Sequence, residues 1–388
     1  MLLLSIIFCC CNSNGQKEQG ENLKEVNPLK RELTRNQQEQ AKRLEKIFHD
    51  LNMQGQFNGN VLIERNDTII FCKSFGYSDY DKKIQLNDSS TFQLASVSKT
   101  ITAAAVLMLV DWEIINLNDP VKKYISEFPY SNVTIQHLLT HRSGLPNYIH
   151  LCAPSVKNHT GNFNNDEIIC FLDSTKPKEY TKPDKKFDYS NTNYFLLASI
   201  VERSTGVTFD NFVKAKIFTP LGMKHTFFYT DTTLYHQHNK TKGYTMDWKP
   251  VLSDAFDGVL GDKGVYSTTG DMLRFAKAYF SGKLFSKNLL VEATSPHSKE
   301  EKEGNYGYGW RMKYFDKGNP DKLIYHNGWW HGYRNAFQHR LNDNTHLIIL
   351  SNRLNKSVYA TQIYFDALDN SVDSTELSQE IKNELKGE

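Results

Sequence analysis

Strand-like segments occur near both ends of this 388-residue chain, and the long stretch between them is typical of helices and turns. Runs rich in β-branched and aromatic residues at 57–63 and 68–77 predict two early strands that form a hairpin. Four later runs also predict strands, at 306–312, 323–326, 333–340 and 346–351. Because strands and helices do not alternate regularly, we expect an α/β (α+β) fold whose antiparallel sheet is built from both ends of the chain.

Apolar residues at helical spacing predict helices that flank this sheet and fill the middle of the chain. These helices are predicted at 32–51, 96–112, 193–204, 209–218, 268–280 and 358–368. The segment at about 118–255 is expected to form a mostly helical insertion, with an irregular polar stretch at 150–187. We expect the active site in the cleft between the insertion and the sheet, because pockets commonly form between such parts.

The ends of the chain differ in composition from its centre. The apolar run 2–8 is too short to span a bilayer and predicts a signal peptide over 1–11. Cysteines follow this run directly, as in a bacterial lipoprotein signal, so Cys10 or Cys11 is a candidate for lipidation. We expect a flexible tether at 12–34, one domain at 35–370 and a polar tail at 371–388. The protein is therefore expected to be exported, in the periplasm or at the cell surface, with a lipid as its only membrane anchor.

Charge and cysteine usage narrow the possible partners. The net charge is only +2, with both signs spread along the chain, so no nucleic-acid partner is expected. No Cys-x-x-Cys pair occurs, and His137 and His141 lack an obvious third metal ligand. We therefore expect neither a metal nor an organic cofactor.

Ser96 and Lys99 form a Ser-x-x-Lys pair at the predicted start of a helix. Residues three apart lie on one helix face, so the hydroxyl and the amine can meet. A desolvated lysine can take the proton that makes a serine hydroxyl nucleophilic. The helix start also offers unpaired N–H groups that suit a developing oxyanion. The alternative for this motif is a capped, buried helix with an exposed lysine.

A second candidate is the pair Tyr189 and Asn191, directly before the predicted helix at 193–204. A tyrosine can shuttle a proton beside cations, and an asparagine amide can hold a substrate carbonyl. The same Tyr-x-Asn pattern begins at Tyr130, Tyr325 and Tyr333. On pattern alone, each of these is as well explained by an ordinary turn.

A third candidate is His326-Asn327-Gly328-Trp329, at the end of a predicted strand. Its glycine indicates backbone that approaches another group closely. A hydrogen-bonding residue on an inner strand, followed by a free N–H group, can complete an oxyanion hole. The alternative is a turn at the strand end with a surface histidine.

Together these pieces resemble the serine β-lactamase and penicillin-binding protein superfamily, and most of all its class C β-lactamase-like group. The resemblance rests on the order of short blocks between about residues 57 and 351. These blocks are Phe57-Asn58-Gly59-Asn60-Val61-Leu62, Ser96-Val97-Ser98-Lys99, Leu117-Asn118-Asp119-Pro120-Val121, Leu138-Leu139-Thr140-His141-Arg142-Ser143-Gly144-Leu145-Pro146, Tyr189-Ser190-Asn191, Pro220-Leu221-Gly222-Met223, Tyr306-Gly307-Tyr308-Gly309-Trp310 and His326-Asn327-Gly328. The resemblance implies an antiparallel sheet flanked by helices with a helical domain, and it selects Tyr189 over Tyr130.

The resemblance also implies a mechanism and the residues that perform it. Ser96 would attack a carbonyl while Lys99 and Tyr189 share its proton, and which of the two is the base stays open. The backbone N–H groups of Ser96 and Trp329 would form the oxyanion hole. The substrate-binding residues that it implies are Asn191, His326 and Gly328. No cofactor is needed, the substrate is a small molecule, peptide or ester, and we expect a monomer.

Two departures from the family pattern bear on the substrate. His326 stands where β-lactamases carry a lysine, and an imidazole is only partly charged near neutral pH, which weakens the case for binding a substrate carboxylate. Trp329 and Trp330 would crowd the cleft. Both favour an esterase, D-amino-acid peptidase or carboxypeptidase over a dedicated β-lactamase, with weak β-lactamase activity at most. The alternative is a penicillin-binding-protein-like sensor or cell-wall binding protein with little turnover.

Overall fold

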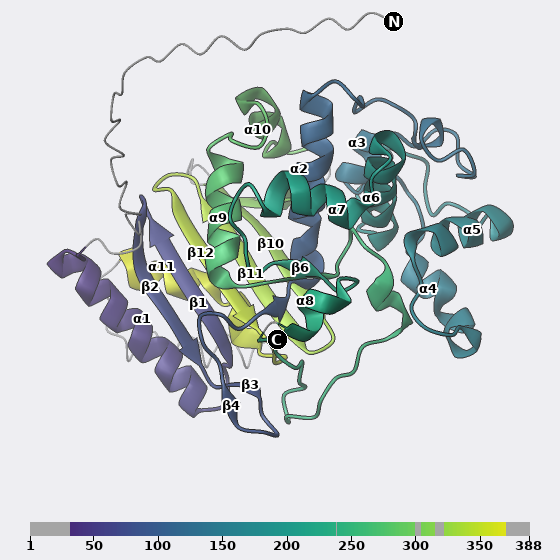
Figure 1. Cartoon of the computed structure of the whole chain (residues 1–388). Helices are drawn as coiled ribbons and strands as arrows, with labels where there is room; N and C mark the ends of the chain where they lie inside the picture. The colour runs from purple at the N-terminus through teal and green to yellow at the C-terminus, as the bar shows by residue number, and fades with distance from the viewer. Residues whose placement is uncertain (1–31, 238, 299–303, 315–321, 370–388) are drawn as a thin grey trace, which may run out of the picture. The chain divides into compact units, whose positions relative to one another are not determined.

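A seven-stranded antiparallel sheet lies at the centre of the computed structural model (Figure 1), which describes residues 32–237, 239–298, 304–314 and 322–369. In sheet order the strands are β2 (Thr68–Phe75), β1 (Gly59–Arg65), β12 (Thr345–Ser351), β11 (Tyr333–Arg340), β10 (Lys322–Trp330), β9 (Arg311–Tyr314) and β8 (Gly304–Tyr306). Because β1 pairs with β12, the early and late strands form one sheet. This confirms the predicted fold class.

Helices cover both faces of this sheet, so the strands are apolar on both sides (Figure 1). On β1, Val61 and Ile63 pack with α1 (Arg35–Met53) and α11 (Thr361–Asp369). Leu62 points to the other face, where the core includes α2 (Ser98–Asp111) and α9 (Thr269–Phe280). Side chains of a strand alternate between faces, and here each face meets its own hydrophobic core.

The first helix and the first hairpin of the domain form where the sequence predicts them. Thr34 and Gln37 form a capping box that starts α1, and the helix then buries an apolar stripe. The β1–β2 hairpin turns at Asn66 and Asp67, which have φ values of 47° and 63°. Asparagine and aspartate tolerate this left-handed conformation, so the predicted hairpin forms where the sequence places it.

Between α2 and α9, helices predominate among the described residues. They are η2 (Val121–Lys123), α3 (Ile135–Leu139), α4 (Tyr148–Cys152), η3 (Ala153–Asn158), α5 (Asn165–Thr175), α6 (Asn191–Thr205), α7 (Phe209–Val213), η4 (Lys214–Phe218), α8 (Thr232–Gln237) and η5 (Ala255–Gly258). Helix α5 lies within the stretch that was expected to be irregular. Its start is fixed by a capping box between Asn164 and Glu167, a signal that was present in the sequence.

Short elements complete the fold around this middle part. A small sheet has the strand order β5 (Phe92–Gln93), β7 (Val265–Ser267), β6 (Phe227–Phe228). The others are β3 (Tyr77–Asp79), β4 (Ile84–Gln85), η1 (Ala95–Val97), α10 (Lys287–Ala293) and η6 (Lys356–Tyr359). Strand β5 leads directly into η1, so the small sheet fixes the approach to Ser96.

The predicted strand at 306–312 is wrong, because the chain turns within it. Residues after β8 form a turn, and β9 starts only at Arg311. Gly309 has a φ of +85°, and a Cβ atom there would lie 2.6 Å from the Cβ atom of Ala103. The turn therefore packs tightly against α2, one helical turn beyond Lys99. The predicted strand at 323–326, in contrast, was too short, since β10 continues to Trp330.

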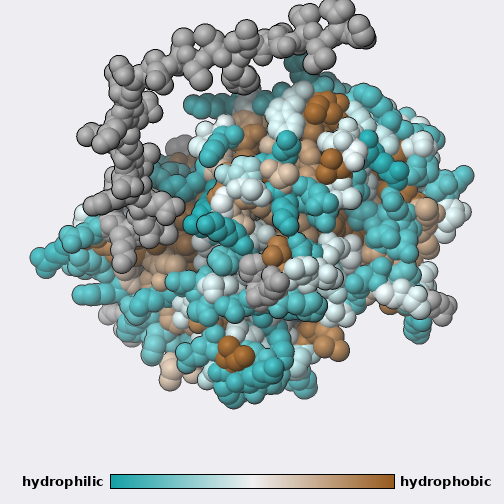
Figure 2. Space-filling view, viewed as in Figure 1, coloured by the Kyte–Doolittle hydropathy of each residue, from teal (hydrophilic) through white to brown (hydrophobic). Residues whose placement is uncertain are grey.

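The predicted signal peptide, most of the predicted tether, both candidate lipidation sites Cys10 and Cys11, and the polar tail lie outside the described residues. Within the described ranges, no helix has the length and apolar character needed to cross a bilayer. On the face shown in Figure 2, hydrophilic residues predominate and hydrophobic ones occur in small separate groups.

Candidate active site

Ser96 lies in the short helical turn η1, directly before α2. Its neighbours Ala95 and Val97 are fully buried, whereas Ser96 is partly exposed. Ala95 has a φ of +51°, a left-handed conformation that is uncommon for a residue other than glycine. Such strain persists where the surrounding structure enforces it, and it often marks functional sites. A buried, strained turn therefore presents the Ser96 side chain.

Lys99 is fully buried and contacts three oxygen atoms. Its Nζ atom lies 3.2 Å from Ser96 Oγ and donates hydrogen bonds of 2.8 Å to Asn191 Oδ1 and to the carbonyl of Asp262. These three oxygen atoms occupy the hydrogen-bonding positions around Nζ. The lysine is therefore held in one position beside the serine hydroxyl, as the Ser-x-x-Lys spacing predicted.

Tyr189 lies in the loop before α6, and its ring has two cationic side chains near it. The Lys99 Nζ atom is 5.1 Å from the ring centroid, and the Arg311 guanidinium carbon is 5.2 Å from it. Asn191 is the first residue of α6, and its bond to Lys99 links this helix to α2. The fold thus brings the Ser96 and Tyr189 motifs together, although about ninety residues separate them in the chain.

His326 is buried in β10, with both ring nitrogens engaged. Its Nδ1 atom donates to the carbonyl of Asn327 at 2.8 Å, and Nε2 accepts from the Tyr306 hydroxyl at 3.0 Å. Burial lowers the pKa of this imidazole well below its usual value, and the cations Arg311 and Lys99 add to the effect. His326 is therefore neutral, and the partial positive charge expected from it is not available.

Gly328 brings strand β10 against the nucleophile turn. A Cβ atom at this position would lie 2.3 Å from the carbonyl oxygen of Leu94 and 3.3 Å from the Cβ atom of Ala95. Only glycine allows this approach. The next residue, Trp329, therefore has its backbone beside the Ser96 turn, while 64% of its side chain is exposed. Trp329 thus places its indole largely in solvent.

Arg311, the first residue of β9, was not among the predicted site residues. Its guanidinium carbon lies 5.2 Å from the ring centroid of Tyr189 and 5.8 Å from that of Tyr306. Within the described ranges, no carboxylate lies within ion-pair distance of it. The sequence signal was available, because Arg311 directly follows the Tyr306–Trp310 block. Because a single strand was predicted through this segment, Arg311 was not considered as a site residue.

A second buried lysine, Lys263, is connected to Lys99 through Asp262. Lys263 forms an ion pair of 3.2 Å with Asp262 and donates a short hydrogen bond to the Tyr148 hydroxyl. Burial raises the pKa of Tyr148 well above its usual value, and the Asp262 carboxylate adds to this rise. The cluster fixes Asp262, whose carbonyl accepts a hydrogen bond from Lys99. Its role in the site is therefore to support the position of Lys99.

A charged cluster holds the β10–β11 turn. The His331 Nε2 atom lies 3.5 Å from an Asp254 oxygen and 3.4 Å from an Asp257 oxygen, and Trp330 Nε1 donates to Asp257 at 2.7 Å. Burial lowers the pKa of His331, but the two carboxylates outweigh it and raise the pKa to about 9. The imidazolium ion of His331 thus offsets one of the two negative charges that Asp254 and Asp257 bring to this turn. The Trp330 side chain is directed to this cluster. It therefore does not crowd the cleft at Ser96, contrary to the prediction.

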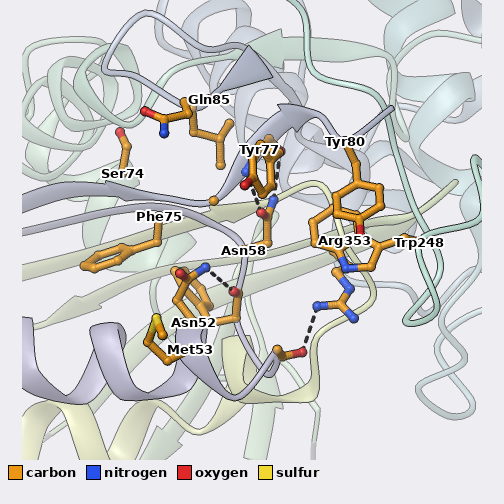
Figure 3. A pocket seen from close by; sticks show the side chains of 14 residues that line it. Asn52, Met53, Asn58, Ser74, Phe75, Tyr77, Tyr80, Gln85, Trp248 and Arg353 are labelled. Carbon is orange, nitrogen blue, oxygen red and sulfur yellow. Dashed lines mark hydrogen bonds between the residues drawn. The ribbon is translucent and has the colours of Figure 1, made fainter. Parts of the chain in front are cut away.

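A cavity of about 450 Å³ lies elsewhere in the domain (Figure 3). It is lined by the end of α1, the end of β2 and the segment around Tyr77, together with Trp248 and Arg353. None of the predicted catalytic residues lines it. In Figure 3 Tyr80, Trp248 and Arg353 lie together at one side of the cavity. The Tyr80 ring stacks on Trp248, and Arg353 lies over the Trp248 ring and donates to the Gly55 carbonyl. These side chains are thus already engaged with one another.

Comparisons with known proteins agree with this fold. The Beta-lactamase family model matches residues 44–370. Penicillin-binding protein 4* of Bacillus subtilis (strain 168) is 33% identical over 342 residues, which cover 84% of this chain and 75% of the relative.

Solved structures show the same likeness. A penicillin-binding protein from Bacillus halodurans superposes with a TM-score of 0.72 at 25% identity, over 83% of this chain and 98% of that one. A D-amino acid amidase from Ochrobactrum anthropi SV3, in complex with D-phenylalanine, reaches a TM-score of 0.72 at 22% identity, over 86% of this chain and 99% of that one. The likeness to the amidase shows that the fold is shared.

Proposed function

The chain belongs to the Beta-lactamase family and is a serine hydrolase, and from this premise we propose that it is an exported enzyme whose acyl-enzyme forms on Ser96. The observation that carries the proposal is the 3.2 Å contact between Ser96 Oγ and Lys99 Nζ. Protein folding alone does not require a buried lysine to hold a partly exposed serine hydroxyl, and nucleophilic catalysis does.

In the acylation step, the Ser96 oxygen attacks the substrate carbonyl as its proton passes to Lys99 or Tyr189. The C–O bond to Ser96 forms, and the carbonyl oxygen becomes an oxyanion. The backbone N–H groups of Ser96 and Trp329 stabilise that oxyanion, and one such donor is typically worth about 3 kcal/mol to the transition state. The 2.8 Å hydrogen bond that Lys99 Nζ donates to Asn191 Oδ1 supports the position of the amine during this transfer.

In the second step, the bond to the leaving group breaks and the same acid–base pair returns the proton. Tyr189, whose ring is near Lys99, delivers this proton to the leaving amine or alkoxide. Water then attacks the ester on Ser96, giving the free acid and restoring the serine hydroxyl. The Nδ2 atom of the Asn191 amide can donate a hydrogen bond that orients the acyl group. No step requires a metal or an organic cofactor.

We infer that the substrate carries a carboxylate near its scissile bond. Arg311 supplies a permanent positive charge next to Tyr189, in a place where no protein carboxylate neutralises it within the described residues. His326 is neutral and its nitrogens are engaged, so Arg311 is the cation that a substrate can meet on this side. This favours a D-amino-acid peptidase or carboxypeptidase over a simple esterase. The names of the similar penicillin-binding proteins and D-amino acid amidase support the same class.

The test is active-site labelling combined with parallel turnover assays. A fluorophosphonate should label the wild-type protein and Ser98→Ala but not Ser96→Ala, because Ser98 is a buried neighbour in the same segment. Nitrocefin, p-nitrophenyl esters and D-amino-acid peptides are then compared, and we expect the peptides and esters to be turned over repeatedly. Labelling of Ser96→Ala would overturn the assignment, and stoichiometric labelling without turnover would indicate the sensor.

Export, lipidation at Cys10 or Cys11, and a monomeric state are also part of this proposal. The short apolar run before the cysteines supports export and lipidation. Intact-mass measurement of the membrane-extracted protein tests the anchor. We expect a diacylglyceryl adduct on the wild-type protein and none on the Cys10→Ser, Cys11→Ser double variant; an adduct on the double variant would exclude both cysteines.

A further inference from the structure

His141 has a left-handed backbone conformation, which is uncommon for residues other than glycine. Helix α3 ends at Leu139, and His141 follows the cap residue Thr140 with a φ of +54°. Glycine is the usual residue at this position after a helix, because it adopts the left-handed conformation without strain. His141 is also fully buried. A histidine kept here against both tendencies indicates that its side chain has a task.

His141 forms hydrogen bonds with the residues directly before and directly after Tyr189. The His141 carbonyl accepts a 2.8 Å hydrogen bond from the backbone N–H of Asp188. Its Nδ1 atom accepts a 3.2 Å hydrogen bond from the backbone N–H of Ser190 and lies 2.9 Å from Asn193 Nδ2. The imidazole centroid is 4.2 Å from that of the Tyr189 ring. One residue thus holds the backbone before and after Tyr189 and contacts its ring.

The protonation state of His141 follows from these bonds. A backbone N–H can only donate, so Nδ1 is the acceptor and the ring proton is on Nε2. Burial lowers the pKa of His141 well below its usual value, and Lys99, Arg311 and His326 add to this. The imidazole therefore stays neutral, and Nδ1 stays an acceptor, across the working pH range. Nε2 is buried without a hydrogen-bond partner in the described part of the chain.

Residues that follow His141 also form backbone hydrogen bonds with the loop that leads to Tyr189. The Arg142 carbonyl accepts from the backbone N–H of Asp184 at 2.8 Å, and the Gly144 carbonyl accepts from Tyr180 at 2.9 Å. A Cβ atom at Gly144 would lie 2.0 Å from the Thr181 carbonyl. The segment after α3 is therefore a support on which the loop lies, and His141 is its contact with Tyr189.

We propose that His141 is a positioning residue for Tyr189, setting the place of the phenol through Nδ1 and its own backbone carbonyl. The inference rests on the proposed function, in which Tyr189 transfers a proton near Ser96. It assigns a task to a block, Leu138–Pro146, that the proposed mechanism does not use. A displaced proton donor slows the chemical step more than it weakens substrate binding.

Three variants test whether the Nδ1 acceptor of His141, and not the rest of its side chain, positions Tyr189. Asn is suited to the left-handed region, and its Oδ1 atom takes the place of Nδ1. We therefore expect His141→Asn to keep kcat on a p-nitrophenyl ester within about fivefold of wild type. His141→Ala lacks the acceptor and should lower kcat by about 100-fold, with KM changed less than threefold. His150→Ala, which changes an exposed histidine in α4, should match wild type.

A double variant and a further substitution test whether His141 acts through the Tyr189 hydroxyl. In a Tyr189→Phe background, His141→Ala should cause little additional loss, because its effect acts through the phenol hydroxyl. An equal loss in both backgrounds, or equal losses in His141→Asn and His141→Ala, would overturn the proposal. If His141→Ala fails to fold, His141→Gln takes its place. Gln puts its acceptor near the Nε2 position, so we expect the large loss with Gln and not with Asn.

Crystal structures separate a failure of this inference from a failure of the proposed function. If the wild-type protein neither turns over esters nor labels at Ser96, the proposed function fails. The Tyr189 phenol should still be displaced in His141→Ala or His141→Gln and remain in place in His141→Asn. An unmoved phenol in all variants would overturn the positioning role by itself.

Discussion

The Nζ atom of Lys99 lies 2.8 Å from Oδ1 of Asn191, and this bond joins the helix behind the nucleophile to the helix that follows Tyr189. Hydrogen bonds to a charged group contribute about 1.5–3 kcal/mol. Asn191→Ala should therefore lower the free energy of unfolding by about 1.5–3 kcal/mol and kcat/KM by about 10- to 100-fold. Asn211→Ala, at an exposed site in α7, is the control. Wild-type kinetics in Asn191→Ala would show that Lys99 is held without this bond.

Gly328 is expected to tolerate no side chain. In Gly328→Ala the new methyl group meets the Leu94 carbonyl, which belongs to the backbone that leads to Ser96 and cannot move aside freely. We expect a stability loss of about 1–3 kcal/mol and slow labelling of Ser96 by a fluorophosphonate. Gly270→Ala, in α9 with no atom closer than 3.8 Å, should instead match wild type or gain stability. Normal labelling of Gly328→Ala would show that β10 does not constrain the nucleophile turn.

Arg311 should discriminate between substrates with and without a free carboxylate. Arg311→Gln should lower kcat/KM for a D-amino-acid peptide by about 10- to 100-fold and change that for its C-terminal amide less than threefold. Lys313→Gln, on the same strand and exposed, tests for a general effect of charge. Equal losses on acid and amide would mean that Arg311 acts through Tyr189 and does not contact the carboxylate.

His331 should stabilise the fold at neutral pH and lose this effect in alkali. Its pKa is raised to about 9 in the folded protein, above the ordinary 6.5, so the folded state holds the proton more tightly. The contribution is complete below pH 6.5 and is lost as the pH rises through 9. Asparagine suits the left-handed φ of 44° but lacks the charge. His331→Asn should therefore be about 1–2 kcal/mol less stable in urea at pH 6, with the difference closing above pH 9.

Two buried histidines should make the protein sensitive to acid. His339 and His346 lie on adjacent strands with their Nδ1 atoms 3.1 Å apart. Burial lowers the pKa of His346 to about 4 and that of His339 to about 2, aided by Lys277 and by His346 respectively. The unfolded chain binds protons near pH 6.5 and the folded one does not, so stability falls as the pH drops from 6.5 towards 4.

Urea unfolding between pH 7.5 and 4.5 tests this relation. The double variant His339→Gln, His346→Gln should lose less stability over that range than wild type. His49→Gln, an exposed histidine on α1, should follow the wild-type curve. Parallel curves for all three proteins would exclude the buried pair as the cause of acid sensitivity.

Much of the sheet was predictable because its signals are local. The predicted strand at 333–340 matches β11, and the first hairpin forms at Asn66 and Asp67 as expected. The Ser96 and Lys99 pair was also within reach of the sequence, since their contact depends only on helical spacing. The break between β8 and β9 was not, because Gly309 is needed for contact with Ala103 on a distant helix.

The sequence by itself determined most strands of the large sheet, the helices that flank it, the nucleophile motif and the family. These follow from periodicity and short spacings, which neighbouring residues determine. Only the tertiary structure decided that His326 is neutral, that Arg311 stands beside Tyr189 and that His141 holds the Tyr189 loop. Each depends on burial and on contacts between residues 15 to more than 100 positions apart. Desolvation and close packing exist only once the chain has folded, so no local pattern records them.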